Sequence, residues 1–281
     1  MFADLHMHTT FSDGTFSPEE MARAANQHQL TIVALTDHDT VAGCARMGAE
    51  CARLGIELVP ATELTAEIDG IEVHLLGYFI DLGNPRFLTN LVKFQEARQN
   101  RIHEMAARLQ RQGVPLKAEA VFAIAKCESP GRPHVARALV QAGLCNTVDQ
   151  AFDRYLKKNR PAWVPKFTIS AHDAIELIHH AGGLAVIAHP ALNQSDDIIP
   201  TLVEAGIDGI ECFHTRHSTA ASQHYLLMAD HFDLAVTGGS DCHGMNRGKP
   251  LMGSIKLPLV YVEALRKRAA ARREKPLNAA A

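Results

Sequence analysis

Short apolar, β-branched runs alternate with helical segments over most of this chain, and this alternation constrains the fold more than any other feature. The runs Thr31–Leu35 (TIVAL) and Leu184–Ala188 (LAVIA) are too short for helices and suit buried strands. The segments between such runs carry helix signals: Ser17 followed by Pro18 predicts a helix start, and Gly55 predicts a helix end. The alternation predicts an α/β fold with a mainly parallel sheet and helices outside it.

The pattern also gives approximate bounds for each element. The predicted strands are Ala3–His8, Thr31–Leu35, Ile56–Pro60, Ile71–Phe79, Leu184–Ala188, Gly209–Phe213 and Leu234–Gly238. The predicted helices are Ser17–Gln29, Thr40–Leu54, Ala171–Ala181, Asp197–Ala205, Thr219–His231 and Val260–Lys275. In barrels of parallel strands the functional site lies at the carboxyl ends of the strands, so we expect the functional residues directly after each strand.

The alternation stops at about Asn84 and resumes after Pro165. The stretch between them, which includes KFQEARQNRIHEMAARLQRQG and PHVARALVQAG, shows helical patterns and no convincing strand. We therefore expect residues 1–84 and 165–281 to form one α/β unit, and residues 85–164 to form an inserted all-helical domain.

Bulk properties exclude several classes of protein. The formal charge of −3 gives no general attraction for long nucleic acid. There is no run of about 18 apolar residues, and the start MFADLHMHTT lacks the basic and apolar stretches of a secretion signal. None of the six cysteines forms a C-x-x-C pair, which argues against a thiolate zinc site. We expect a cytoplasmic protein with reduced thiols, no membrane association and no obligate protein partner.

Histidines and carboxylates gather in the predicted strands or directly after them. Two H-x-H or D-x-H pairs stand out, because a spacing of two in extended chain places both side chains on one face. The full set is His6, His8, Asp13, His38, Glu63, His74, His189, Asp241 and His243. A single histidine at a strand end is more often structural than a ligand, and the histidines within predicted helices suit surface or packing roles. The pairs and the concentration at strand ends favour a metal site instead.

The composition of this set limits the metal and its number. Imidazole together with carboxylate suits Zn, Mn or Fe, and the absence of thiolate argues against a purely structural zinc. Nine candidate ligands exceed the needs of one ion, so we expect two or three divalent cations bridged by a carboxylate. Such clustered cations activate water and stabilise the charge that develops on a phosphate ester.

Four segments together resemble the motifs of the PHP (polymerase and histidinol phosphatase) family. They are DLHMHTTFSDG, LTDHDT, the HP of IAHPA, and GSDCHG, and they occur in the family's order. The resemblance covers residues 1 to about 84 and about 165 to 255. It implies a distorted (β/α)7 barrel with a trinuclear metal centre, often of Mn, Fe or Zn.

Carried over by position, the resemblance also implies a ligand set for each ion. One ion would take His6, His8, Glu63 and Asp241. Glu63 would bridge to a second ion held by His74 and His189, and Asp13, His38 and His243 would hold the third. Every ligand position of the family pattern is filled, so the resemblance implies an active enzyme.

The inserted segment contains Ser129-Pro130-Gly131-Arg132-Pro133-His134, which is similar to a GRPH motif in one group of the family. That group contains the 3′,5′-nucleoside bisphosphate phosphatases, which hydrolyse 3′-phosphoadenosine 5′-phosphate to AMP, and the RNase AM type of 5′-to-3′ exoribonuclease. The resemblance implies that the insertion caps the metal site.

The cap also carries cations that suit a phosphate, since arginine binds phosphate in a bidentate manner. Arg132 and His134 precede an apolar helix whose amino terminus favours anions, and we assign them substrate contact and a catalytic role. The candidate substrate-binding residues are Lys93, Arg98, Arg101, Ser129, Arg132, His134, Arg216 and His217. For Lys93, Arg98 and Arg101 a solvated helix face is the alternative. Three aromatic side chains are candidates for stacking on a base, and core packing is an equal alternative for each: Phe11, Tyr78 and Phe213.

We therefore expect a phosphomonoesterase that acts on a small nucleotide. Exonucleolytic cleavage of short RNA and hydrolysis of histidinol phosphate are the related alternatives. A non-catalytic module of a polymerase would predict missing ligands or a much longer chain. Amide hydrolysis would predict another motif order and often a carboxylated lysine, and no lysine stands at a plausible strand end.

Overall fold

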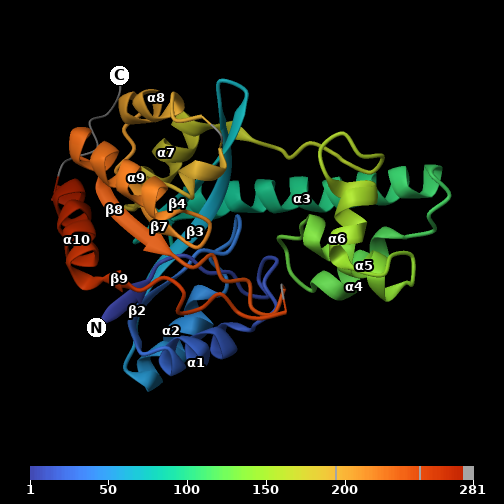
Figure 1. The fold of residues 1–281 in the computed structure, drawn as a ribbon, viewed down its shortest axis with the longest axis horizontal. Coiled ribbons are helices and arrows are strands. Elements are labelled where there is room, and N and C mark those ends of the chain that lie inside the picture. The colour runs from blue at the N-terminus through green and yellow to red at the C-terminus, as the bar shows by residue number, and fades with distance from the viewer. Residues whose placement is uncertain (194, 247, 275–281) are drawn as a thin grey trace.

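The computed structural model of this chain describes residues 1–193, 195–246 and 248–274. Within them a curved sheet forms a nearly closed barrel with helices outside it (Figure 1). The strands are β1 (Phe2–Asp4), β2 (Leu30–Leu35), β3 (Glu57–Ile68), β4 (Ile71–Tyr78), β5 (Ile169–Ser170), β6 (Leu184–Ile187), β7 (Gly209–His214), β8 (Ala235–Gly239) and β9 (Leu257–Pro258). Their order is β8-β7-β6-β4-β3-β2-β1-β9, and β5 pairs with β3.

The helices follow the predicted pattern closely. They are α1 (Pro18–Gln27), α2 (Cys44–Leu54), α3 (Pro85–Arg111), α4 (Ala118–Ala125), α5 (Arg132–Gln141), α6 (Val148–Ala151), α7 (Ala171–His180), α8 (Ile198–Glu204), α9 (Thr219–His231) and α10 (Leu259–Glu274), with short turns η1 (Phe152–Leu156) and η2 (Pro190–Leu192). The last residue of the helix predicted to reach Lys275 lies outside the described residues. Among the described residues, no helix has both the length and the apolarity needed to cross a bilayer.

Local capping explains where the first two helices begin and end. The Ser17 hydroxyl accepts a hydrogen bond from the Glu20 N–H, and the Glu20 carboxylate accepts one from the Ser17 N–H, which confirms the predicted start of α1. Gly55 ends α2 with a φ of 70°, a left-handed conformation that glycine adopts without strain. Helix α2 begins later than predicted, because the Thr40 hydroxyl accepts the Ala42 N–H in a turn.

The sheet is mainly parallel, as predicted, but it also contains antiparallel pairings that the alternation did not predict. Strand β3 does not end at Pro60 but continues to Ile68, and β4 returns antiparallel to it. The turn between them is Asp69-Gly70, with φ values of 51° and 77°, and an Asp-Gly pair favours this two-residue hairpin. Strand β4 is also antiparallel to β6, whereas β6, β7 and β8 are parallel.

The barrel closes between the segment after β1 and the segment after β8. Regular strand β1 ends at Asp4, short of the predicted His8, but the chain stays beside β8: the Leu5 N–H donates to the Gly238 carbonyl at 3.1 Å. Further along the same two segments, the Asp241 N–H donates to the His6 carbonyl at 2.9 Å. A Cβ on Gly239 would lie 2.3 Å from the His6 Cβ, so this close approach requires glycine. Closure therefore places two histidine-bearing segments side by side.

Two packed layers stabilise the barrel. Its interior contains Leu5, Val59, Leu76 and Val186, together with Tyr78, whose hydroxyl donates to the Leu5 carbonyl at 2.9 Å. Tyr78 is thus a core residue and not a base-stacking one. A second apolar layer lies between the sheet and the outer helices. All six cysteines are free thiols, as predicted.

The segment between β4 and β5 contains helices α3 to α6 and η1, which lie to one side of the barrel (Figure 1). The first half of the long helix α3 packs on the barrel through Phe87, Leu91 and Phe94. Its second half, through Ile102 and Leu109, packs on the smaller helices in a separate apolar cluster. One helix therefore connects the two cores.

Candidate metal centre and adjoining cavity

The nine predicted metal-ligand residues meet at one end of the barrel. They come from separate segments: the stretch after β1 supplies His6, His8 and Asp13, the end of β2 supplies His38, the β3–β4 hairpin supplies Glu63 and His74, the end of β6 supplies His189, and the end of β8 supplies Asp241 and His243. This end carries the carboxyl termini of the parallel strands, where such barrels place their functional residues.

Glu63 lies at the centre of the group and contacts imidazoles with both carboxylate oxygens. Its Oε2 lies 3.1 Å from His8 Nε2 and 3.1 Å from His38 Nδ1. Its Oε1 lies 2.6 Å from His74 Nδ1 and 3.2 Å from His189 Nε2. A carboxylate with donors on both sides has the arrangement of a bridging ligand.

Four donor atoms, of which Glu63 Oε2 is one, have spacings that fit a single cation. The Nε2 atoms of His6 and His8 are 3.1 Å apart and lie 3.5 and 3.1 Å from Glu63 Oε2. Asp241 Oδ1 lies 3.4 Å from His6 Nε2 and 3.3 Å from His8 Nε2. An ion about 2.1 Å from each donor separates neighbouring donors by about 3.0 Å in an octahedron and about 3.4 Å in a tetrahedron. The residues present therefore fit a divalent cation.

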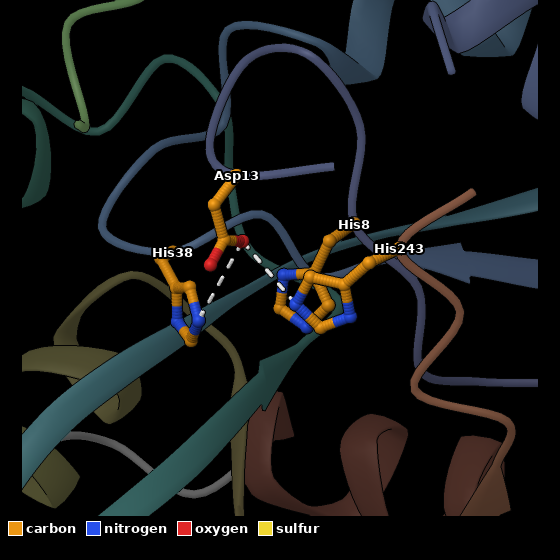
Figure 2. A group of neighbouring side chains, drawn as sticks. All are labelled: His8, Asp13, His38 and His243. Carbon is orange, nitrogen blue, oxygen red and sulfur yellow. Dashed lines mark ion pairs between the residues drawn. The ribbon is translucent and has the colours of Figure 1, made fainter. Parts of the chain in front are cut away.

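The third predicted group surrounds Asp13. Figure 2 shows the Asp13 carboxylate pointing toward the rings of His38 and His243, with His8 behind His243. Asp13 Oδ1 lies 3.2 Å from His243 Nε2 and 4.0 Å from His38 Nε2. Asp13 Oδ1 is buried and has no hydrogen-bond partner in the described part of the chain. A buried acceptor in this state favours a cation.

The pKa values of the clustered carboxylates and of His243 also favour cation binding at these groups. Burial alone would raise the pKa of Glu63, but His38, His74 and His6 outweigh it and lower that pKa well below the usual range. The pKa values of Asp13 and Asp241 fall well below their usual range despite burial, chiefly because of His243. The three carboxylates are thus anionic at neutral pH. Burial opposes charge on His243, yet Asp13 and Asp241 raise its pKa to about 10, so a cation here would replace protons.

Strand β7 contributes two buried residues that the sequence patterns did not single out. Glu211 Oε1 lies 3.0 Å from His6 Nδ1, and Glu211 Oε2 accepts a hydrogen bond of 2.7 Å from the His189 N–H. His214 Nε2 lies 3.5 Å from Asp241 Oδ2. A charged residue within the apolar run GIECF was the available signal for Glu211.

Lys166 also lies beside the nine candidate ligands, and the sequence patterns did not predict this position. Its Nζ lies 3.0 Å from His74 Nε2 and donates to Glu72 at 2.8 Å. Lys166 precedes β5 and so lies at the amino end of a strand, not at the carboxyl end, where the metal ligands of a barrel gather.

A cavity of about 770 Å³ opens directly on the group, and its size falls in the usual range for small-molecule sites. Its floor includes Glu63, His74, His189, Asp241 and His243, and its far wall comes from α5, α6 and η1. Among the described residues, the lysine and arginine side chains that line it are Arg132, Arg137, Lys157 and Arg216. Two of these, Arg137 and Lys157, were not predicted.

Arg132 and Arg216 line the cavity as predicted from their positions, but the other candidate substrate residues lie elsewhere. Lys93 is exposed on α3. Arg98 and Arg101 line a separate small pocket, where Arg98 Nε donates to Asp39 at 2.5 Å and Arg101 Nε to the Val164 carbonyl at 2.9 Å. The Ser129 hydroxyl donates to the His38 carbonyl at 2.5 Å.

His134 and His217 are held by contacts of their own. His134 is buried, and its Nδ1 accepts a hydrogen bond of 3.0 Å from the Gly131 N–H. Burial lowers the pKa of His134 to about 4, so the ring is neutral at pH 7 and suits fixing the Gly131 turn better than donating a proton. His217 Nδ1 lies 3.0 Å from the Cys212 carbonyl, and its ring stands edge-on to His214.

Comparison with known proteins identifies relatives that cover most of the chain. The family model of the PHP domain matches residues 4–162. A 5′-3′ exoribonuclease from Haemophilus influenzae is 35% identical over 246 residues, which cover 85% of this chain and 89% of the relative. A 3′,5′-nucleoside bisphosphate phosphatase from Chromobacterium violaceum is 34% identical over 256 residues, covering 87% and 88%. A solved structure from Bifidobacterium adolescentis, of a protein named as a metal-dependent phosphoesterase, matches with a TM-score of 0.87 and 32% identity over 95% of this chain and 96% of that one.

Proposed function

The chain belongs to the PHP family and is a hydrolase of phosphoric ester bonds, and on that premise we propose that it removes the 3′-phosphate from 3′,5′-nucleoside bisphosphates such as 3′-phosphoadenosine 5′-phosphate. The products would be the 5′-nucleotide and phosphate. The observation that carries the proposal is the position of Glu63: its carboxylate joins two sets of imidazoles at the floor of a cavity of nucleotide size lined by arginines.

The proposed cofactor is a set of divalent cations, two or three per chain, with Mn²⁺ first and Fe²⁺ or Zn²⁺ next. His6, His8, Glu63 and Asp241 would hold one ion. Glu63, His74 and His189 would hold another, and Asp13, His38 and His243 the third. When bound, such ions lower the pKa of coordinated water and neutralise charge on a phosphoryl group.

The residues of the chain would bind and orient the substrate around this centre. The 3′-phosphate lies at the cavity floor, where the donor group faces it. Arg132 and Arg137 on the opposite wall suit the remaining phosphate, since each has guanidinium N–H groups free of any carboxylate partner in the described residues. We propose that residues 85–164 act as a cap that closes one side of the cavity, and that the enzyme works in the cytoplasm without a membrane or an obligate protein partner.

A second candidate is 5′-to-3′ exonucleolytic cleavage of short RNA. The exoribonuclease relative favours it, because that protein is as similar to this chain as the bisphosphate phosphatase is. Both reactions break a phosphoester bond at the 3′ oxygen of a nucleotide that has a 5′-phosphate, so one site could perform both. Hydrolysis of histidinol phosphate is a third option without support from the cavity cations.

The test is a substrate panel with protein reconstituted in Mn²⁺. Release of phosphate is measured from 3′-phosphoadenosine 5′-phosphate, 5′-AMP and histidinol phosphate, and mononucleotides are measured from a 5′-phosphorylated RNA pentamer. We expect rapid, EDTA-sensitive release from the bisphosphate with accumulation of 5′-AMP. Comparable release of mononucleotides from the pentamer would assign the exoribonuclease activity instead. A Glu63→Gln preparation purified in parallel reveals any contaminating phosphatase.

A further inference from the structure

We propose that β7, a strand to which no metal ligand is assigned, positions the metal centre: Glu211 orients His6 and His189, and His214 orients Asp241. The inference rests on the proposed metal binding at the Glu63 group. Glu211 and His214 would not contact metal or substrate. They would instead fix which atoms of the three ligands face the ions.

Glu211 determines the tautomer of His6. Glu211 is fully buried, and its Oε1 lies 3.0 Å from His6 Nδ1. An ionised carboxylate only accepts hydrogen bonds, so His6 Nδ1 carries a proton. In the neutral ring the lone pair then belongs to Nε2, the atom that faces His8, Glu63 and Asp241. A carboxylate that supports the far nitrogen of a ligating histidine is a recurrent device, because it fixes the ring and makes it a stronger donor.

The other oxygen of Glu211 holds the backbone at a second ligand. Oε2 accepts the His189 N–H at 2.7 Å. His189 has a φ of 32°, in the left-handed region that residues other than glycine rarely adopt. This backbone conformation places His189 Nε2 3.2 Å from Glu63 Oε1, whereas His6 Nε2 lies nearest the other carboxylate oxygen, Oε2. A single buried carboxylate thus connects a ligand of the first proposed ion with a ligand of the second.

His214, the last residue of β7, lies beside Asp241. His214 Nδ1 accepts a hydrogen bond of 3.2 Å from the Arg216 N–H, so the proton of the neutral ring resides on Nε2. That Nε2 is buried, lacks a conventional hydrogen bond within the described residues, and lies 3.5 Å from Asp241 Oδ2. An N–H at this distance from Oδ2 attracts that oxygen and leaves Asp241 Oδ1 to face His6 and His8.

The experiment compares Mn²⁺ binding to the wild type, Glu211→Gln and His214→Gln by calorimetric titration of chelator-stripped protein. Glutamine keeps the size of Glu211, but it cannot accept from both His6 and His189, since one of its terminal groups is a donor. We expect about 10- to 100-fold weaker Mn²⁺ binding with unchanged stoichiometry in each variant. Glu204→Gln, an exposed carboxylate on α8, is the matched control and should bind as the wild type does.

Co²⁺ substitution supplies a readout that a purely structural role would not move. The visible absorption of bound Co²⁺ reports ligand geometry, and we expect shifted bands in Glu211→Gln and His214→Gln at saturating Co²⁺. Wild-type affinity with unshifted bands in both variants would overturn the inference. Loss of one ion at unchanged affinity for the others would also overturn it, by making Glu211 a direct ligand. Failure of the wild type to bind metal would instead refute the proposed function on which the inference rests.

Discussion

Arg137 of α5 donates a hydrogen bond of 2.8 Å from Nη2 to the main-chain carbonyl of Asp13. The helical segment therefore supports the loop that carries a proposed metal ligand. Arg137→Ala removes this charge-assisted bond, which contributes about 1.5–3 kcal/mol, and we expect about tenfold or weaker Mn²⁺ binding at the Asp13 group. Metal content after dialysis at stepped Mn²⁺ concentrations measures the effect. Arg160→Ala, an exposed arginine in the same segment between β4 and β5, is the control, and full metal content in Arg137→Ala would contradict the prediction.

Glu63→Gln should remove metal and activity together. The amide keeps the shape of the carboxylate but loses its charge and one acceptor oxygen, so it cannot bridge two ions. Since loss of a residue that merely supports a ligand weakens metal binding about 10- to 100-fold, we expect at least a 100-fold loss of kcat/KM for a shared ligand. Metal analysis and phosphate release are measured on one preparation. Retention of both properties would exclude the bridging role.

Arg132→Ala should weaken turnover of nucleotides and leave metal content intact. Arg132 lines the cavity wall opposite the metal ligands, and its only hydrogen bond within the described residues is a weak one of 3.4 Å to the Leu156 carbonyl. Loss of a charged donor to phosphate costs about 1.5–3 kcal/mol, or about 10- to 100-fold in kcat/KM. Lys158→Ala, an exposed cation close in sequence to the cavity wall, should change kcat/KM less than twofold. Equal kinetics for the two variants would remove Arg132 from the substrate site.

The elements that could be predicted are those with local causes. Ser17-Pro18 starts α1 through its own cap, and the run of β2 is apolar enough to be buried wherever it lies. The continuation of β3 beyond Pro60 was missed because polar residues interrupt its apolar run, and one of them, Glu63, faces the metal centre and not the core. The antiparallel return of β4 had a local signal in Asp69-Gly70, which the strand–helix alternation outweighed.

In the candidate site, too, features with a local sequence signal could be predicted, and features that depend on distant parts of the chain could not. Seven of the nine candidate ligands belong to the four short motifs, Glu63 and His74 follow or lie in a predicted strand, and the structure brings all nine together. Glu211 contacts the candidate ligand His189 because β7, which carries Glu211, pairs with β6, which directly precedes His189. Arg137 bonds the main chain of Asp13 because α5 lies near the loop that carries Asp13. Such contacts depend on tertiary neighbours far apart in the chain, which spacing patterns do not encode.

His134 should make the protein less stable in acid. Its pKa in the folded chain is lowered by burial from about 6.5 to about 4, so the unfolded state binds more protons between these values. The contribution of neutral His134 is present above about pH 6.5 and is lost as the pH falls toward 4. A difference of about 2.5 pH units corresponds to about 3 kcal/mol. Urea unfolding of metal-free wild type and His134→Gln between pH 4 and 7.5 measures it, and a pH-independent difference would contradict a buried neutral ring.

Asp208 should stabilise the fold without affecting catalysis. It precedes β7 at the end of the barrel opposite the metal centre, and it is almost fully buried. Its Oδ2 accepts from the Ala185 N–H at 2.9 Å and contacts His179 Nε2 at 2.7 Å, while Oδ1 accepts from Arg272 at 2.5 Å. The carboxylate thus links α7 and α10 to strand β6 through hydrogen bonds and an ion pair.

Asp208→Asn keeps one acceptor oxygen and turns the other into a donor that faces a donor. Breaking a buried ion pair from one side costs about 3–5 kcal/mol, and the partly exposed Arg272 reduces this, so we expect a loss of about 2–3 kcal/mol in the free energy of unfolding. Asp233→Asn is the matched control, because the Asp233–Arg268 pair lies on the surface and should contribute less than about 1 kcal/mol. Urea unfolding in EDTA gives the stability, and kcat with Mn²⁺ should stay within twofold of wild type in both variants. A fall in kcat without a fall in stability would mean that this end of the barrel communicates with the metal centre.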